Sequence, residues 1–194
     1  MKTKAALPYA LIDDKNVSPI VAAYFELVHL KQLYRQGWLR HGVTPDKCES
    51  VAEHSFGVAM LALLLVESQA PALDKTKVLS MALIHDLGEV YAGDFTPADN
   101  IAAEEKASLE RKSIKKILLK LPGGGKYAKL WEEYETGVSA EACFVRELDR
   151  LEMSLQASVY QQQGMLPAPE EFFLSTRKVV GSPNVAIIMD ELEQ

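Results

Sequence analysis

The sequence is poor in the residues that cross-link small proteins or hold structural zinc. It has 194 residues with only two cysteines, Cys48 and Cys143, and no CxxC pair. Two cysteines are too few for a disulfide framework, and the usual zinc or redox motif of cysteine proteins is missing. We therefore expect a cytoplasmic protein. The N-terminus favours the same location, because Pro8 interrupts its short apolar stretch and no small-residue cleavage site follows.

Long hydrophobic runs and concentrated positive charge are also missing. The longest apolar run, residues 56–66, has 11 residues, whereas a membrane-spanning helix needs about 20. Lys and Arg total 21 against 27 Asp and Glu, a formal net charge of −6. We expect neither a membrane nor a nucleic-acid polymer as partner. The length fits one globular domain better than two.

The spacing of the apolar residues predicts an all-α fold. Apolar positions recur every three or four residues through most of the chain, and few stretches alternate with period two. Ser50 and Glu53 form a capping-box pattern at the start of one helix, and Asp74 is placed to cap the next. The pattern predicts helices at about residues 18–36, 50–69, 77–87, 100–121, 126–134, 139–163, 169–178 and 184–192.

A histidine and an aspartate stand side by side in one of these apolar segments. His85 and Asp86 lie in the stretch LSMALIHDLGE, where burial of both groups costs several kcal/mol unless they are paired or bound to a cation. Adjacent helical residues point about 100° apart, so an imidazole and a carboxylate can converge on one ion between helices. For the dipeptide alone, a histidine bonded to a backbone carbonyl is the simpler alternative.

Two further residues strengthen the metal interpretation. His54 lies on the preceding predicted helix, and Asp149 lies at the edge of the apolar stripe of a later one, where an acid can reach inward. Two imidazoles and two carboxylates suit one borderline divalent ion such as Mn²⁺, Co²⁺, Fe²⁺, Ni²⁺ or Zn²⁺, with positions left for water and substrate. Because these ligands accept several ions, the sequence leaves the identity of the metal open.

This set of histidines and aspartates resembles that of the HD-domain metal-dependent phosphohydrolase superfamily. The segments ESVAEH, ALIHDLGE, GDFTPADN and LWEEYET resemble its 5′-deoxynucleotidase branch over about residues 20–162. The resemblance implies a single helical HD domain over residues 1–194, with short C-terminal helices at 165–194. It also implies hydrolysis of deoxynucleoside 5′-monophosphates to deoxynucleoside and phosphate by a metal-activated water. The implied ligands of one metal between the helices are His54, His85, Asp86 and Asp149.

Two acidic residues that follow the His-Asp pair are candidates for acid–base catalysis. Glu89 lies four residues after His85 and three after Asp86, which puts it on the metal-facing side if the helix continues through Gly88. Asp94 follows in the next loop, and the resemblance implies that it contacts the attacking water or the sugar. The sequence does not divide the acid and base roles between these two residues.

A phosphate monoester carries about −1.5 to −2 charges at neutral pH, so we expect an arginine near the metal. Arg35 and Arg40 flank Trp38. The resemblance implies one arginine for the phosphate and one tryptophan packed against the sugar, where it crowds a 2′-hydroxyl. Arg40 is our first choice and Arg35 the second, and Trp38 fits simple core packing equally well. We assign neither His29 nor His41 to the metal.

Other activities of the superfamily are the alternatives. Dinuclear relatives need further histidines after the His-Asp pair, and none follows His85. A (p)ppGpp-type pyrophosphohydrolase shares the mononuclear arrangement. A non-catalytic regulatory HD domain is the weaker alternative, because all the implied ligands and both acids are present. The resemblance also implies a homodimer that binds a small nucleotide.

Overall fold

The computed structural model describes residues 1–192, which form an all-α fold as predicted. In this part of the chain there is no β-strand, and backbone pairing outside the helices forms two isolated β-bridges, Thr3 with Leu33 and Tyr34 with Ser50. Residues 193–194 of the predicted single domain lie outside the described residues. The α-helices are α1 (Pro19–Leu27), α2 (Gln36–Arg40), α3 (Val51–Gln69), α4 (Lys75–Ile84), α5 (Glu89–Ala92), α6 (Ala103–Leu118), α7 (Gly124–Thr136), α8 (Ala140–Gln162), α9 (Glu170–Arg177) and α10 (Pro183–Leu192).

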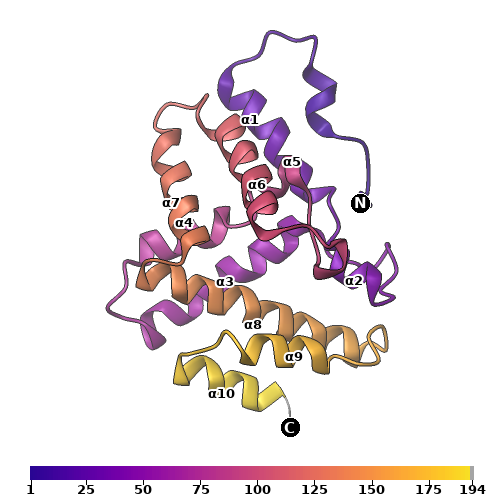
Figure 1. The fold of residues 1–194 in the computed structure, drawn as a ribbon, viewed down its shortest axis with the longest axis vertical. Helices are drawn as coiled ribbons and strands as arrows, with labels where there is room; N and C mark the ends of the chain where they lie inside the picture. Colours follow the sequence, from indigo (N-terminus) through magenta and orange to yellow (C-terminus); the bar gives the residue numbers. More distant parts are fainter. Residues whose placement is uncertain (193–194) are drawn as a thin grey trace.

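Helices α3, α4 and α8 form the centre of the molecule (Figure 1). The first apolar core lies among these helices, and α9 and α10 cover α8 from the far side. A second core lies among α1, α5, α6 and α7. Val51 in the first turn of α3 belongs to the second core, whereas Val58 belongs to the first. The N-terminal half of α3 therefore lies where the two cores meet.

The capping patterns in the sequence locate the starts of α3 and α4. The Ser50 side chain accepts the backbone N–H of Glu53, and the Glu53 carboxylate accepts the backbone N–H of Ser50 at 2.6 Å. Asp74 caps α4 by accepting the backbone N–H of Lys77 at 3.1 Å. Each cap satisfies backbone donors that the first turn of a helix leaves free.

Two of the predicted helices are interrupted, and both interruptions concern candidate site residues. The predicted helix 18–36 is divided into α1, a 3-10 turn (Val28–Lys31), an extended stretch and then α2. The stretch leaves the helical path because the backbone N–H of Arg35 bonds to the carbonyl of Glu49 at 3.0 Å, next to the bridge between Tyr34 and Ser50. Helix α4 ends at Ile84 and residues 85–88 form turns, so the predicted helix 77–87 is too long at its C-terminus. The condition for placing Glu89 on that helix, its continuation through Gly88, is not met.

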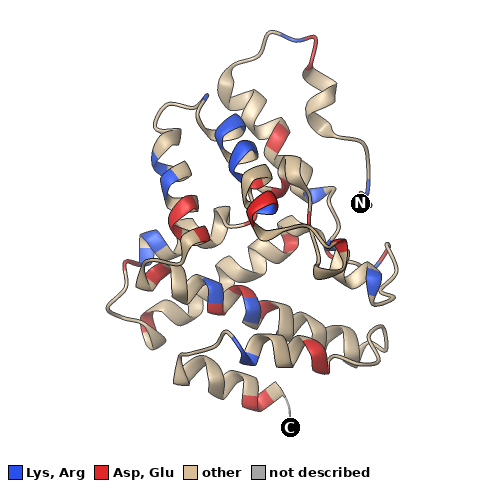
Figure 2. Cartoon of the chain, viewed as in Figure 1, with Lys and Arg blue, Asp and Glu red and all other residues tan. Residues whose placement is uncertain are grey.

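Helix α3 is the only helix in residues 1–192 that is long and apolar enough to cross a membrane, with 19 residues and a hydropathy of 1.4. The apolar run of 11 residues did not predict this, because the helix also includes the mixed residues that flank the run. Buried core helices can have the same length and composition, so these two properties do not by themselves identify a membrane span. Figure 2 shows Lys and Arg gathered on the C-terminal half of α6 and the start of α7, where residues 111–129 hold seven of them and no Asp or Glu.

Candidate metal centre

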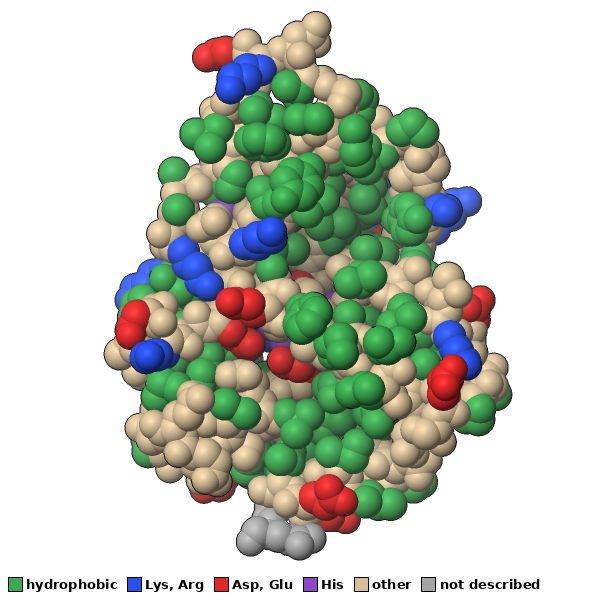
Figure 3. Space-filling view, turned by 180° about the vertical axis from the view of Figure 1, so that it is seen from behind, with side chains coloured by type: hydrophobic (Ala, Val, Ile, Leu, Met, Phe, Trp, Pro, Cys, Tyr) green, Lys and Arg blue, Asp and Glu red, His purple; other side chains and the backbone are tan. Residues whose placement is uncertain are grey.

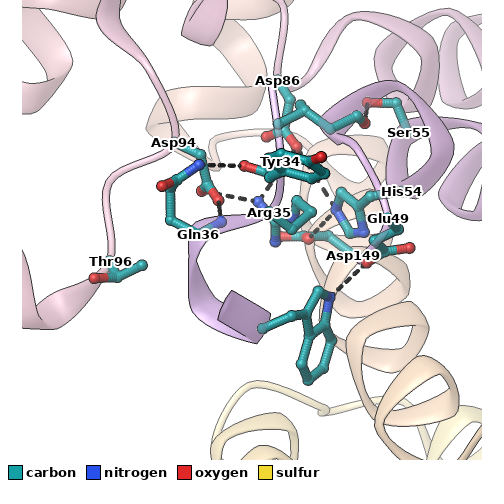
Figure 4. Close-up of polar contacts among 12 residues, drawn as sticks. Tyr34, Arg35, Gln36, Glu49, His54, Ser55, Asp86, Asp94, Thr96 and Asp149 are labelled. Carbon is teal, nitrogen blue, oxygen red and sulfur yellow. Dashed lines mark hydrogen bonds and ion pairs between the residues drawn. The ribbon is translucent and has the colours of Figure 1, made fainter. Parts of the chain in front are cut away.

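The four implied metal ligands lie together at the junction of the two cores, and Figure 4 shows three of them, His54, Asp86 and Asp149. His54 comes from α3, His85 and Asp86 from the turn after α4, and Asp149 from α8. His54 Nε2 lies 3.4 Å from His85 Nε2 and 3.1 Å from Asp149 Oδ1. Asp86 Oδ2 lies 3.3 Å from His85 Nε2 and 3.6 Å from His54 Nε2. Residues that are far apart in the sequence thus direct their donor atoms to one point.

In both histidines, Nδ1 forms a hydrogen bond that orients Nε2 toward the other ligand atoms. His85 Nδ1 lies 2.8 Å from the carbonyl oxygen of Ala82, and His54 Nδ1 lies 2.5 Å from Glu152 Oε2. With the proton on Nδ1 in both rings, both Nε2 atoms would offer a lone pair to a cation; without a cation, His54 Nε2 carries a second proton and donates it to Asp149 Oδ1. Two lone pairs 3.4 Å apart repel each other unless a proton or a cation lies between them.

The chemistry of the donor set fits a divalent cation. Asp86 Oδ2 is buried and has no hydrogen-bond partner among residues 1–192. A buried carboxylate oxygen without a hydrogen bond is costly, and a bound cation satisfies it directly. Ligand atoms of His54, His85 and Asp149 lie within 4.8 Å of one another, close enough to hold one ion. Two imidazole nitrogens and two carboxylates form a typical site for a borderline metal.

The charges of the cluster support one another. Burial disfavours the ionised form of Asp86, but the neighbouring His85 and Arg35 outweigh it and hold the Asp86 pKa well below its ordinary value. The pKa of Asp149 is also lowered, because its hydrogen bond to His54 outweighs burial. Burial opposes charge on His54 as well, yet its bonds to Asp149 and Glu152 raise the His54 pKa to about 10. The two carboxylates are therefore ionised and ready to bind a cation.

Arg35 and Asp94 lie beside the four ligands. Arg35 Nη1 donates to Asp94 Oδ1 at 3.1 Å and lies 3.9 Å from Asp86 Oδ2. Asp94 Oδ2 also accepts the backbone N–H of Gln36 at 2.5 Å, so both oxygens of this carboxylate are used (Figure 4). The break between α1 and α2 is what carries Arg35 to this position. Asp94 thus holds the arginine-bearing segment against the ligands.

Glu89 is buried at the start of α5, a separate short helix, rather than on a continuation of α4. Its Oε2 has no hydrogen-bond partner among residues 1–192. Burial, followed by the charges of Asp86 and Asp94, raises the Glu89 pKa well above its ordinary value. Glu89 is therefore a carboxyl group that can hold a proton beside the metal ligands.

The other predicted contacts are placed elsewhere. Arg40, our first choice for the phosphate, pairs with Asp99, and its side chain is 42% exposed; the arginine that the structure brings to the ligands is Arg35. Trp38 is buried in the first core against Phe172, and its indole N–H donates to Glu49 at 2.7 Å. This matches the core-packing alternative for Trp38. The unassigned histidines also lie away from the ligands, with His29 buried near Tyr9 and His41 paired with Glu171.

Several residues that support the ligands were not predicted as part of the site. Glu152 bonds to His54, the hydroxyl of Tyr134 donates to Asp149 Oδ2 at 3.3 Å, and the indole N–H of Trp131 donates to the carbonyl of His85 at 3.0 Å. Glu152 lies three residues after Asp149, so one turn of α8 places both acids on one face. That spacing was the available signal. The contacts of Trp131 and Tyr134 depend on the packing of α7.

Comparison with known proteins gives a consistent set of relatives. A family model described as "HD domain" matches residues 27–189. The "5'-deoxynucleotidase HDDC2" of Bos taurus is 35% identical over 192 residues, which is 97% of this chain and 91% of the relative. The protein of the same name from Dictyostelium discoideum is 43% identical over 141 residues, 69% of this chain and 73% of the relative.

Solved structures share the fold. A conserved hypothetical protein from Pyrococcus furiosus superimposes with a TM-score of 0.74 at 31% identity, covering 89% of this chain and 98% of the other. A structure titled "Predicted metal-dependent phosphohydrolase" from Magnetospirillum magnetotacticum has a TM-score of 0.67 at 29% identity, covering 90% of this chain and 91% of the other.

Proposed function

Because the chain belongs to the HD-domain family, we propose that it is a metal-dependent 5′-deoxynucleotidase, which hydrolyses deoxynucleoside 5′-monophosphates to deoxynucleoside and phosphate. The observation that carries the proposal is the buried cluster of donor atoms from His54, His85, Asp86 and Asp149, with the guanidinium of Arg35 at its edge. The relatives named 5′-deoxynucleotidase match most of the chain and support the choice of substrate.

These four residues would hold one divalent ion. When bound, such an ion lowers the pKa of water in contact with it and neutralises phosphate charge. The ligand set does not distinguish Mn²⁺, Co²⁺, Fe²⁺, Ni²⁺ and Zn²⁺, since availability usually decides among them.

Arg35 is the group that we propose to bind the phosphate. Its side chain is only 17% exposed and approaches Asp86, one of the ligands. A guanidinium carries five N–H donors in a planar fork, so Arg35 can keep its bond to Asp94 while other N–H groups face a phosphate oxygen. Because Asp94 accepts from both Arg35 and the backbone of Gln36, its role is to orient this arginine.

Glu89 is the group that we propose to transfer the proton. Its carboxyl group is buried, and one of its oxygens is unpartnered among residues 1–192, so this oxygen is free to contact a water or the leaving 5′-oxygen. The attacking water must lose a proton and the departing deoxynucleoside oxygen must gain one. A single carboxyl group beside the ligands can perform both transfers in turn.

Two substitutions separate these roles. Asp86→Ala should lose both bound metal and activity, whereas Glu89→Ala should keep the metal and lose activity. Phosphate release from dAMP and Mn²⁺ binding by electron paramagnetic resonance measure the two properties separately. Full turnover in Glu89→Ala would remove the proton-transfer role. In a substrate panel, release of pyrophosphate from ppGpp in preference to phosphate from dAMP would favour the pyrophosphohydrolase alternative. Release of neither product from any nucleotide would favour a regulatory domain.

We further propose that the protein forms a homodimer through the exposed side of α3. Phe56 is 66% and Leu64 65% exposed, and Met60 and Leu63 are exposed on the same side of the helix. Seen from behind, the molecule shows broad hydrophobic areas (Figure 3). An uncharged apolar patch is self-complementary under twofold symmetry. A membrane surface fits this side of α3 less well than a second copy of the chain. Helices that bind membrane surfaces are rich in Lys and Arg, whereas the exposed apolar residues of α3 are flanked by the acids Glu53 and Glu67.

Light scattering after size-exclusion chromatography tests the dimer. Phe56→Glu and Leu64→Glu should each give monomers, while Leu174→Glu, at an equally exposed position on α9, should leave the dimer intact. A wild-type monomer that sediments with vesicles of phosphatidylcholine and phosphatidylserine would overturn the proposal in favour of a membrane surface.

A further inference from the structure

One carboxylate of the cluster has no role in the proposed reaction. Glu152 is buried on α8, one turn after Asp149. The two acids bond to opposite nitrogens of the same ring, because Asp149 Oδ1 lies 3.1 Å from His54 Nε2 and Glu152 Oε2 lies 2.5 Å from His54 Nδ1. Helix α8 thus contributes one ligand, Asp149, and a second acid, Glu152, that hydrogen-bonds to Nδ1 of another ligand, His54.

A glycine in the middle of α3 leaves room for this contact. Gly57 lies three residues after His54, and a Cβ atom added there would meet Glu152 Oε1 at 2.5 Å and Glu152 Cγ at 2.9 Å. Glycine in a helix interior costs about 1 kcal/mol relative to alanine. Any larger residue at position 57 would push the Glu152 carboxylate away from the imidazole. The sequence therefore carries a local helix penalty at the point where the carboxylate needs space.

A second cation site is the competing explanation for these groups. Ligand atoms of Glu49, His54 and Glu152 lie within 4.8 Å of one another. Glu49 Oε1, however, already accepts the indole N–H of Trp38 at 2.7 Å. A second ion would also need His54 to give up its Nδ1 proton while Nε2 serves the first ion. The hydrogen bond to Glu152 needs no such change, so the geometry favours one ion with an oriented ligand.

We propose that Glu152, in the space left by Gly57, is a positioning residue that fixes the proton of His54 on Nδ1 and turns Nε2 toward the metal. The inference rests on the proposed function in taking His54 as a ligand. Ligating histidines depend on such carboxylate partners for ring orientation and basicity, and loss of the partner weakens metal affinity about 10- to 100-fold.

Metal titration of the full chain tests the proposal without measuring turnover. Co²⁺ absorption in competition with a chelator should show a weakening of about 10- to 100-fold for Glu152→Ala. Glu152→Gln should lie between this variant and wild type, because the amide oxygen still accepts from Nδ1 but carries no charge. Gly57→Ala should weaken binding in the same direction, since the new methyl group displaces Glu152. Gly125→Ala is the matched control, because a Cβ there meets nothing within 4 Å.

Nuclear magnetic resonance supplies a direct view of the tautomer. In Zn²⁺-loaded protein with ¹⁵N-labelled histidine, His54 should show a slowly exchanging Nδ1–H proton, assigned by its absence in His54→Gln. That signal should be lost in Glu152→Ala and displaced in Gly57→Ala.

The possible outcomes separate this inference from the proposed function. Unchanged Co²⁺ affinity in both Glu152→Ala and Gly57→Ala would overturn the positioning role. An Nδ1–H signal of His54 that is retained in Glu152→Ala would also overturn it. Two bound ions per chain would overturn it in favour of a second site. A wild-type chain that binds no metal would instead overturn the proposed function. If Glu152→Ala fails to fold by circular dichroism, Glu152→Gln and Gly57→Ala still decide the question.

Discussion

Replacing Arg35 with alanine should impair the enzyme far more than replacing Arg40, although both arginines lie close to Trp38 in the sequence. Arg35 is largely buried and reaches both Asp94 and the metal ligand Asp86. Arg40 pairs with Asp99, and its side chain is 42% exposed. The two variants remove the same side chain at a site position and at a surface position, so each serves as the control for the other.

The size of the effect follows from the bond that is lost. A hydrogen bond to a charged group contributes about 1.5–3 kcal/mol, and each 1.36 kcal/mol corresponds to about a tenfold change in rate. Arg35→Ala should therefore lower kcat/KM for dAMP about 10- to 150-fold. The kcat/KM of Arg35→Lys should lie between those of Arg35→Ala and the wild type, because an ammonium keeps the charge but not the planar fork. Arg40→Ala should change kcat/KM by about fivefold or less, since an exposed ion pair contributes about 1 kcal/mol or less.

Initial rates of phosphate release from dAMP at saturating Mn²⁺ give kcat/KM for all three variants. Mn²⁺ affinity should be measured alongside, because Asp86 loses a cationic neighbour in Arg35→Ala and binds the metal at least as well. A loss of more than tenfold in Arg40→Ala, with Arg35→Ala close to wild type, would refute the assignment. The phosphate contact would then belong to Arg40.

Further predictions concern stability and thiol reactivity. Burial raises the pKa of Glu110 from 4.5 to about 7, so between these values the folded protein keeps a proton that the unfolded chain has released. In urea unfolding, the free energy of unfolding should fall by about 3 kcal/mol as pH rises through this window. Glu110→Gln should flatten this dependence on pH, and an unchanged dependence in the variant contradicts the burial argument. Burial also raises the pKa of the Cys48 thiol to about 12, so Ellman's reagent should modify only the exposed Cys143 in native protein and both thiols in urea; two fast native thiols would contradict this. Trp131→Phe should lower the free energy of unfolding by about 1–3 kcal/mol, because it leaves the buried carbonyl of His85 without its donor, and a neutral result in the same assay would show that water replaces the indole.

Local signals in the sequence predicted much of the fold. The capping residues Ser50, Glu53 and Asp74 fixed the starts of α3 and α4, because a helix start depends on residues within one turn. The division of the first predicted helix at Arg35 could not be predicted in this way. It depends on backbone pairing with Glu49, a residue that lies in a loop with no periodic pattern.

The candidate site shows the same difference between local and distant information. His85 and Asp86 were recognisable as polar residues in an apolar segment, and His54 and Asp149 by their positions on other predicted helices. The resemblance then implied all four as ligands. The choice between the arginines required knowing where Asp94 lies, because only the folded chain brings that carboxylate to Arg35. Glu152 was missed although its spacing from Asp149 was visible, since nothing in the sequence indicates that His54 Nδ1 needs a partner.

Phosphate release from metal-stripped protein, reconstituted with Mn²⁺, Co²⁺ or Zn²⁺ and given the five deoxynucleoside 5′-monophosphates and their ribonucleoside counterparts, tests the proposed activity most directly. Release should require added metal and should be faster from dAMP than from AMP. Metal-independent release, or faster release from AMP than from dAMP, would contradict a metal-dependent 5′-deoxynucleotidase.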